Sequence, residues 1–181
     1  GGVASGTVVS GGGRQYVLTG AVASGTQLSG GTEIIDGTTS ATAVGNGGLE
    51  VVGVGAVASA ATVLNGGTLF VNGTANGMLV SAGGNAFELS GGVAIATMVI
   101  AGYDFVRSGG TTSNAVLVAG ASQLVNGAAS GTVVSSGSAQ YAMVGGTTVA
   151  TTVSSSAFEF ASSGGVASNT VLGNGGPHLD R

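Results

Sequence analysis

The residues that could carry acid–base or metal chemistry are few, and most of them recur at regular intervals. The 181 residues include seven acids, three arginines, one histidine and no cysteine. One repeating position holds a carboxyl or carboxamide side chain in eight places: Gln15, Glu33, Glu50, Glu88, Asp104, Gln123, Gln140 and Glu159. Paired carboxylates are the residues with which glycosidases work, so this set must first be considered as a catalytic one.

Catalysis and metal binding are nevertheless not predicted. In a stacked repeat the acids would stand about one strand spacing apart on a flat face, with no cleft between them. The single histidine, His178, is at the C-terminal end, so the body of the chain can build no Ser-His-Asp or Cys-His arrangement. No acid lies in the GGxGxD motif of calcium-binding solenoids, and lysine is absent, which excludes a phosphate-binding GxxxxGK[ST] loop. We therefore expect no catalytic, cofactor-binding or metal-binding residues.

A repeat of about 18 residues fills the chain almost from end to end and must position these side chains. Its copies begin near Gly1, Gly20, Gly37, Gly55, Gly73, Gly91, Gly109, Gly127, Gly145 and Gly164. A fixed period of this length is typical of a solenoid, in which each copy forms one coil and buries its apolar face on its neighbours. The apolar residues are mainly Val, Ala, Ile and Leu, which favour strands, and no sustained helical stripe is present. The sequence predicts an all-β fold: a single-stranded parallel β-helix of about ten coils over residues 1–181.

The first copy predicts how one coil is built. It contains three short strand-like pieces, near residues 3–5, 7–9 and 15–17, separated by glycines. Three such pieces with tight corners use about 18 residues and give a roughly triangular section. Pairs such as Gly11-Gly12 and Asn46-Gly47 mark the corners, because positive φ costs little only for Gly or Asn.

The third piece of each coil places a polar residue directly before a bulky one, as in Gln15-Tyr16, Glu33-Ile34 and Glu159-Phe160. Neighbours along a strand point to opposite faces, so we expect the bulky residues to face the core and the polar residues to face solvent. The eight Gln, Glu and Asp residues named above are then an exposed contact ladder.

The second piece carries a threonine-rich position, occupied by Thr7, Thr26, Thr42, Thr62, Thr97, Thr132, Thr151 and Thr170. Threonine is favoured here as a β-branched stacking residue at a coil edge. The alternative is an outward array of hydroxyls that orders water at an ice surface, but such arrays are more regular.

Charge and hydropathy exclude several partners. Only Arg14, Arg107 and Arg181 are strong bases and the formal net charge is −4, so nucleic acid and an anionic membrane surface are not expected to bind. No apolar stretch reaches the 18 residues of a membrane-spanning helix, and no signal peptide opens the chain. We expect a mature segment or fragment of a longer protein. Pro177 would then be either a capping residue of the last coil or part of a cut end.

The copies GGVASGTVVSGGGRQYV, GAVASGTQLSGGTEII and GAASGTVVSSGSAQYAMV resemble the passenger repeats of AIDA-type autotransporter adhesins, the self-associating surface proteins of Gram-negative bacteria. The shared elements are the G-x-[VAT]-x-S-x-T opening, the S-G-G corner and the Q/E-aromatic-V strand. The resemblance covers nearly the whole chain. It implies a right-handed parallel β-helix displayed outside the cell by a C-terminal outer-membrane barrel that this segment lacks.

The resemblance also implies a function in adhesion or self-association, as in cell aggregation and biofilms, with sugars on Ser and Thr. The partners would be a second copy or a receptor on a host cell or surface, and the location would be the bacterial cell surface. Two alternatives stay open. One is a passive stalk that presents another domain, and the other is a polysaccharide-active enzyme on the same fold, which lacks a supporting cluster of acids and bases.

Overall fold

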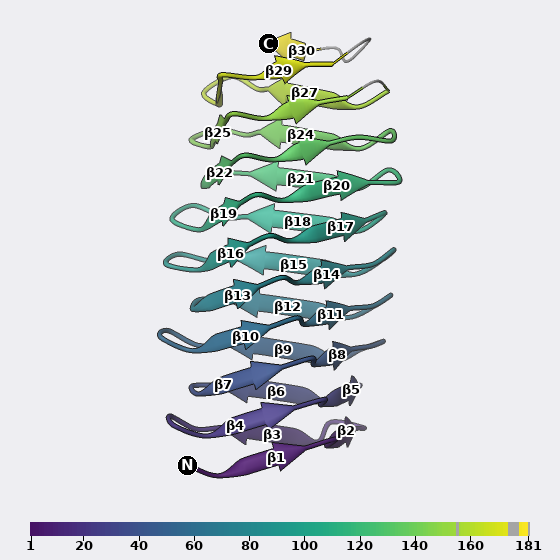
Figure 1. Ribbon diagram of the computed structural model, residues 1–181, viewed down its shortest axis with the longest axis vertical. Helices are drawn as coiled ribbons and strands as arrows, with labels where there is room; N and C mark the ends of the chain where they lie inside the picture. Colours follow the sequence, from purple (N-terminus) through teal and green to yellow (C-terminus); the bar gives the residue numbers. More distant parts are fainter. Residues whose placement is uncertain (155, 174–177, 181) are drawn as a thin grey trace.

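The computed structural model describes residues 1–154, 156–173 and 178–180, and these form a rod of stacked coils (Figure 1). Each coil contributes one strand to each of three parallel sheets, and each sheet has ten strands. The described residues contain no helix, and therefore none that is long and apolar enough to cross a bilayer. The all-β solenoid predicted from the repeat is confirmed. The predicted role of Pro177 lies outside the described residues.

The three sheets take every third strand of the chain. The first sheet contains β1 (Val3–Ser5), β4 (Val22–Ser24), β7 (Thr38–Ser40), β10 (Val57–Ser59), β13 (Thr74–Asn76), β16 (Val93–Ile95), β19 (Thr111–Ser113), β22 (Ala128–Ser130), β25 (Thr147–Val149) and β28 (Val166–Ser168). The second sheet contains β2 (Val8–Ser10), β5 (Gln27–Ser29), β8 (Ala43–Val44), β11 (Thr62–Val63), β14 (Leu79–Val80), β17 (Met98–Ile100), β20 (Val116–Val118), β23 (Val133–Val134), β26 (Thr152–Val153) and β29 (Val171–Leu172). The third sheet contains β3 (Arg14–Val17), β6 (Thr32–Ile35), β9 (Leu49–Val52), β12 (Thr68–Val71), β15 (Asn85–Glu88), β18 (Tyr103–Val106), β21 (Ser122–Val125), β24 (Ala139–Ala142), β27 (Phe158–Ala161) and β30 (His178–Asp180).

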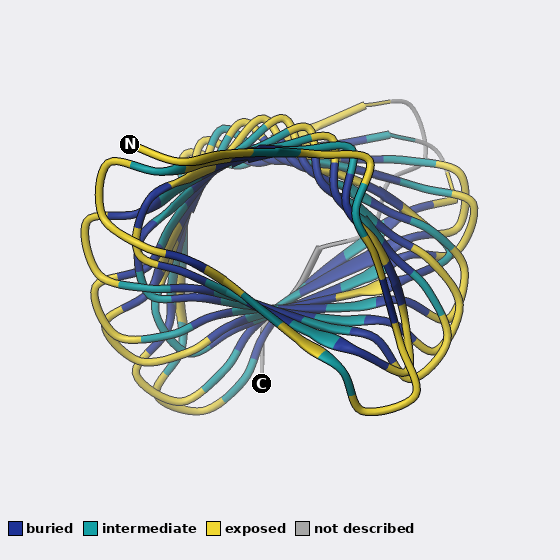
Figure 2. Ribbon diagram, turned by 90° about the horizontal axis from the view of Figure 1, so that it is seen from below, coloured by how far each residue is buried: buried dark blue, intermediate teal, exposed yellow. Residues whose placement is uncertain are grey.

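Equivalent residues lie directly above one another along the rod. In the first sheet, for example, Val3 pairs with Val22 and Ala4 with Ala23. We call such a set of equivalent positions a column. In-register columns of like residues favour stacking of β-branched and aromatic side chains, so the short strands of each coil gain most of their contacts from adjacent coils. Seen end-on, the coils wind around one common axis, and successive coils are rotated relative to one another (Figure 2).

The core is thin and consists of small residues. The first sheet points an alanine column inward, which includes Ala23, Ala58 and Ala75. The second sheet contributes a valine and leucine column, represented by Val44 and Val80, which are fully buried. Because few large side chains are needed to fill this interior, coils of about 18 residues can close around it.

The corner between the first and second sheets requires a left-handed residue in every coil. Glycine provides it at Gly25, with φ of 64°, but alanine takes the same conformation at Ala60, with φ of 53°, and at Ala150, with φ of 56°. The glycine pairs expected at the other corners also have positive φ, as at Gly11 and Gly47.

Candidate functional surface and the polar interior

The predicted contact ladder lies inside the solenoid, and the prediction that it faces solvent is wrong. Seven of its eight side chains have no exposed surface, namely Glu33, Glu50, Glu88, Asp104, Gln123, Gln140 and Glu159. Gln15, in the first coil, is half-buried. A contact between rods cannot use these residues.

The register also separates Glu88 from the other members. Its coil places Ala86 in the column, between Leu69 and Asp104. Glu88 lies two residues further along β15, beside Val71 and Val106 in the next inward column. The prediction that Glu88 shares one repeating position with the other seven residues is therefore out of register by two residues.

Threonine hydroxyls from the first sheet and from the start of the second sheet donate hydrogen bonds to the buried carboxylates. Thr26 donates to one oxygen of Glu33 at 3.0 Å, and Thr42 of the next coil donates to the other oxygen at 3.0 Å. Glu159 is held in the same way, by Thr148 at 2.8 Å and Thr170 at 2.6 Å. A buried polar group costs little free energy when its hydrogen bonds are made, which is why these acids are tolerated inside.

The threonine column thus points into the core, so it forms neither an outward array that orders water nor a mere edge. Thr62 does not belong to it. In that coil Ala61 occupies the buried position, and Thr62 lies beside Ala43 and Leu79 in the adjacent outward column.

Carboxamides extend this network along the rod axis. Gln123 donates through Nε2 to Asp104 Oδ2 at 2.7 Å, and Gln140 donates through Nε2 to Gln123 Oε1 at 2.6 Å. Thr151 then donates to Gln140 Oε1 at 2.8 Å. The result is a chain of hydrogen bonds through four successive coils, similar to the amide ladders of cross-β stacks.

Three acids in the central coils, Glu50, Glu88 and Asp104, have at least one carboxyl oxygen without a hydrogen-bond donor. Glu50 accepts from Thr39 at 3.3 Å, but its second carboxyl oxygen has no hydrogen-bond partner. Burial and the nearby charge of Glu33 raise the pKa of Glu50 to about 8. Burial raises the pKa of Glu88 well above its usual range, and the adjacent Asp104 carboxyl raises it further. Burial also raises the pKa of Glu33, against the hydrogen bonds from Thr26 and Thr42.

The outward face of the third sheet carries the bulky residues that were expected in the core. All eight aromatic residues of the chain lie on this surface, which we call the aromatic face: Tyr16, Phe70, Phe87, Tyr103, Phe105, Tyr141, Phe158 and Phe160. Tyr16 is 56% exposed and Tyr103 is 47% exposed, while the phenylalanines are half-buried by one another.

The aromatic rings pack in two groups along the rod. Phe70, Phe87 and Phe105 form one, with ring centroids 5.1 and 4.6 Å apart, and the second pair is nearly parallel. Tyr141 and Phe160 lie 5.0 Å apart in the other. Such offset contacts contribute about 0.5–1.5 kcal/mol each beyond burial, so the face helps to hold successive coils in register.

Both arginines with described side chains lie at this face as well. The Arg107 guanidinium is 5.4 Å from the Phe87 ring centre and 5.2 Å from that of Phe105, within range of a cation–π interaction. Arg14 donates to the Tyr16 hydroxyl at 3.5 Å. This hydrogen bond raises the pKa of the exposed Arg14 guanidinium.

A pattern in the sequence could have identified the outward side. Arg14 and Tyr16 are two residues apart in one strand and must share a face, and an unpaired arginine cannot face a core. On the opposite side, the residue two after each polar position is small or β-branched, as at Val17, Ile35 and Ala142.

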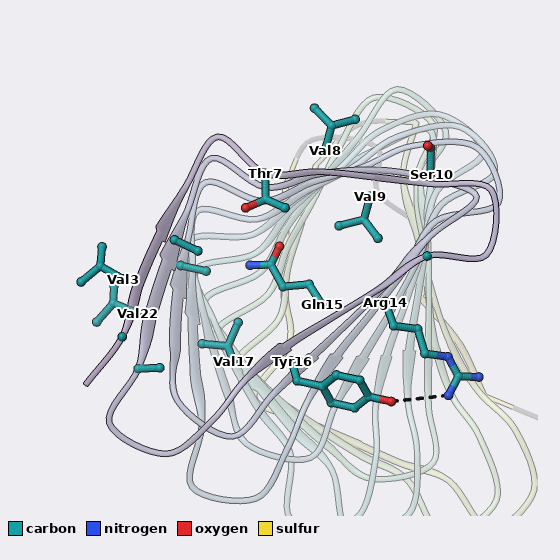
Figure 3. A pocket seen from close by; sticks show the side chains of 15 residues that line it. Val3, Thr7, Val8, Val9, Ser10, Arg14, Gln15, Tyr16, Val17 and Val22 are labelled. Atoms are coloured by element: carbon teal, nitrogen blue, oxygen red, sulfur yellow. Dashed lines mark hydrogen bonds between the residues drawn. The ribbon is translucent and has the colours of Figure 1, made fainter.

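The end of the rod at the first coil contains a cavity of about 600 Å³. Figure 3 shows Val9, Gln15 and Val17 pointing into it, whereas Arg14 and Tyr16 point away from the axis. No acid lines this cavity, and it opens onto the interior columns described above. Within the described residues, no group of three or more His, Cys, Asp or Glu side chains is placed to hold a metal ion.

This architecture is also present in a protein of known structure. No family model and no curated protein matches the sequence. A solved structure does match: the TibC-catalysed, hyper-glycosylated fragment of TibA, residues 55–350. The similarity has a TM-score of 0.78 and 27% identity, and it covers 99% of this chain and 82% of the TibA fragment. TibA is an autotransporter adhesin. The similarity confirms the resemblance of this chain to AIDA-type autotransporter passenger repeats.

Proposed function

We propose that this chain is a segment of a surface-displayed autotransporter passenger that mediates bacterial adhesion or self-association. The observation that carries the proposal is the similarity to the TibA fragment over nearly the whole chain. A rod of uniform coils presents long flat faces rather than a reaction cleft, which suits repeated weak contacts that gain strength by avidity.

The aromatic face is the surface that we assign to these contacts. Aromatic residues and arginine are enriched in protein interfaces, because they bury large area and retain a polar group for orientation. The buried acids leave little negative charge on the outside. Asp36 is the one exposed acid among the residues whose side chains are described, so repulsion between two rods is weak.

The test coats beads with the chain and measures clumping and attachment to cultured cells. We expect coated beads to clump or attach where uncoated beads do not. Replacing Tyr16 and Tyr103 by Ser should reduce this several-fold, because both rings project from the aromatic face.

The matched control replaces Val8 and Met98 by Ser. These residues are 65% and 45% exposed, and they lie on the second sheet in the same two coils as the tyrosines. This variant should behave like the wild type. If coated beads neither clump nor attach, the chain is a spacer and the proposal fails. Equal loss in both variants would show that the aromatic face is not the contact surface.

Surface display, a longer parent protein and sugar modification belong to the same proposal. The TibA fragment is hyper-glycosylated, and this chain has exposed hydroxyls such as those of Ser10, Ser29 and Ser108. We expect the protein from its native host to be heavier than its sequence mass by whole sugar units. Intact-mass measurement checks this, and a mass equal to that of the bare chain would contradict it.

A further inference from the structure

The interior acids differ in the number of hydrogen-bond donors that face them, and this difference determines where protons must reside. Glu33 and Glu159 each have a threonine donor at both carboxyl oxygens. Glu50 has one donor and one bare oxygen. Both oxygens of Glu88 and one oxygen of Asp104 accept no hydrogen bond from a donor.

Among the side chains that the structure describes, no cation compensates these groups. Arg14 and Arg107 lie outside, and the described interior contains no Lys, Arg or His. The groups that face Glu50 are Thr39, Thr42 and the Glu33 carboxyl. Those that face the Glu88–Asp104 pair are each other and Gln123, with Val71 and Val106 beside Glu88. An isolated buried carboxylate without donors is far costlier than a protonated one.

We propose that the solenoid folds with proton uptake, one proton on the bare oxygen of Glu50 and one shared between Glu88 and Asp104, so that alkaline solution loosens the central coils. In the shared pair, the proton resides on Glu88, and the protonated carboxyl group donates a hydrogen bond to Asp104. The Asp104 carboxylate accepts a second bond from Gln123 at 2.7 Å. The two sites lie in the third coil and across the fifth and sixth coils, so the middle of the rod responds to pH.

The direction of the effect follows from proton linkage. The folded chain holds protons that the unfolded chain has released, because an unfolded glutamate has an ordinary pKa of 4.5. Stability is therefore fully present below about pH 4.5 and falls as the pH rises. For Glu50 the loss extends to its folded pKa of about 8. Each proton taken up changes the unfolding equilibrium constant about tenfold per pH unit inside this window.

The test measures the unfolding equilibrium constant in urea at pH 6, 7 and 8. For two protons we expect the wild-type constant to rise about 100-fold from pH 6 to pH 7. The rise from pH 7 to pH 8 should be smaller, because the pH then reaches the folded pKa of Glu50, which is about 8. Glu50→Gln should reduce the rise to about tenfold. Glu88→Gln should do the same, because its amide can donate to Asp104 without a titrating proton. Asp36→Asn, which alters the exposed corner acid, should leave the wild-type dependence unchanged.

Two further measurements complete the test. Asp104→Asn provides a second substitution at the pair if Glu88→Gln does not fold, and proton release on unfolding can be followed with a pH indicator in weak buffer. An equilibrium constant that is equal at pH 6 and pH 8 overturns the proposal, as does a dependence that survives in Glu50→Gln and at the pair. Calcium at pH 8 should have no effect. Stabilisation by calcium that vanishes in Glu88→Gln would make the pair a metal site instead.

Discussion

At the scale of the residue, a polar side chain inside this solenoid depends on partners in adjacent coils. Gln140 illustrates this, because it donates to Gln123 in the coil before and accepts from Thr151 in the coil after. It also donates to Thr132 at 3.0 Å. Each such side chain therefore connects adjacent coils and also fills the core. Removing one leaves its partners without hydrogen-bond donors or acceptors.

Replacing Gln140 by Leu tests this tie. The shape is nearly conserved, but Thr151 and Gln123 lose their partner, so the free energy of unfolding should fall by about 2 kcal/mol or more. Urea denaturation measures the loss. Adding Thr151→Val should recover part of the lost stability, because the unpaired hydroxyl of Thr151 is then removed. Gln27→Leu on the outside of β5 is the control and should change stability by less than about 0.5 kcal/mol. A Gln140→Leu protein as stable as the control would show that the hydrogen bonds of Gln140 contribute nothing to the free energy of unfolding.

At the scale of the element, each coil is limited by its corners. The turn from the first to the second sheet needs a left-handed residue, and several coils place alanine there, including Ala60 and Ala150. A left-handed alanine costs roughly 1–2 kcal/mol because its Cβ approaches the following carbonyl. The repeat tolerates this cost because strand pairing on both sides fixes the corner.

Ala60→Gly and Ala150→Gly should each raise the free energy of unfolding by about 1 kcal/mol. The reverse change, Gly25→Ala, should lower it by a similar amount. A Cβ at Gly25 would have no atom nearer than 3.9 Å, so any loss there reports backbone strain rather than a clash. Thermal and urea unfolding of the three variants provide the measurement. Destabilisation by the glycines would show that their extra freedom in the unfolded chain outweighs the strain.

At the scale of the whole molecule, burial of the acids makes the charge on the surface of the rod less negative than its formal net charge. The chain has seven acids, yet five of them lie in the interior. Among the described side chains, the exterior instead presents the aromatic face, two arginines and Asp36. The rod is therefore much less acidic on its surface than its composition indicates, which favours close approach of neutral or apolar partners.

The isoelectric point tests this difference between the formal charge and the surface charge. With Glu50 and Glu88 protonated in the folded state, the native chain should focus at a higher pH than the same chain in urea. Native and urea isoelectric focusing measure the difference. Asp36→Asn should shift both values together, because that side chain is exposed in either state. Identical native and urea values would mean that the buried acids are ionised in the folded chain.

The sequence by itself determined the period, the three strands of each coil and the corners. These properties are local, since glycine pairs permit positive φ and β-branched residues favour strands wherever they occur. The pattern of the third strand also revealed that its two sides differ. It did not reveal which side faces the core, because the rule of polar outside and apolar inside considers each strand alone, without its neighbours in adjacent coils.

Only the tertiary structure decided that question. The donors that make Glu33 acceptable inside are Thr26 and Thr42, one of which belongs to another coil, so no single strand contains the information. The position of Glu88 was likewise set by the register of the whole sheet, which aligns Ala86 with Asp104. Burial of a polar residue is a property of the neighbours that surround it, and in a solenoid those neighbours are brought together by stacking.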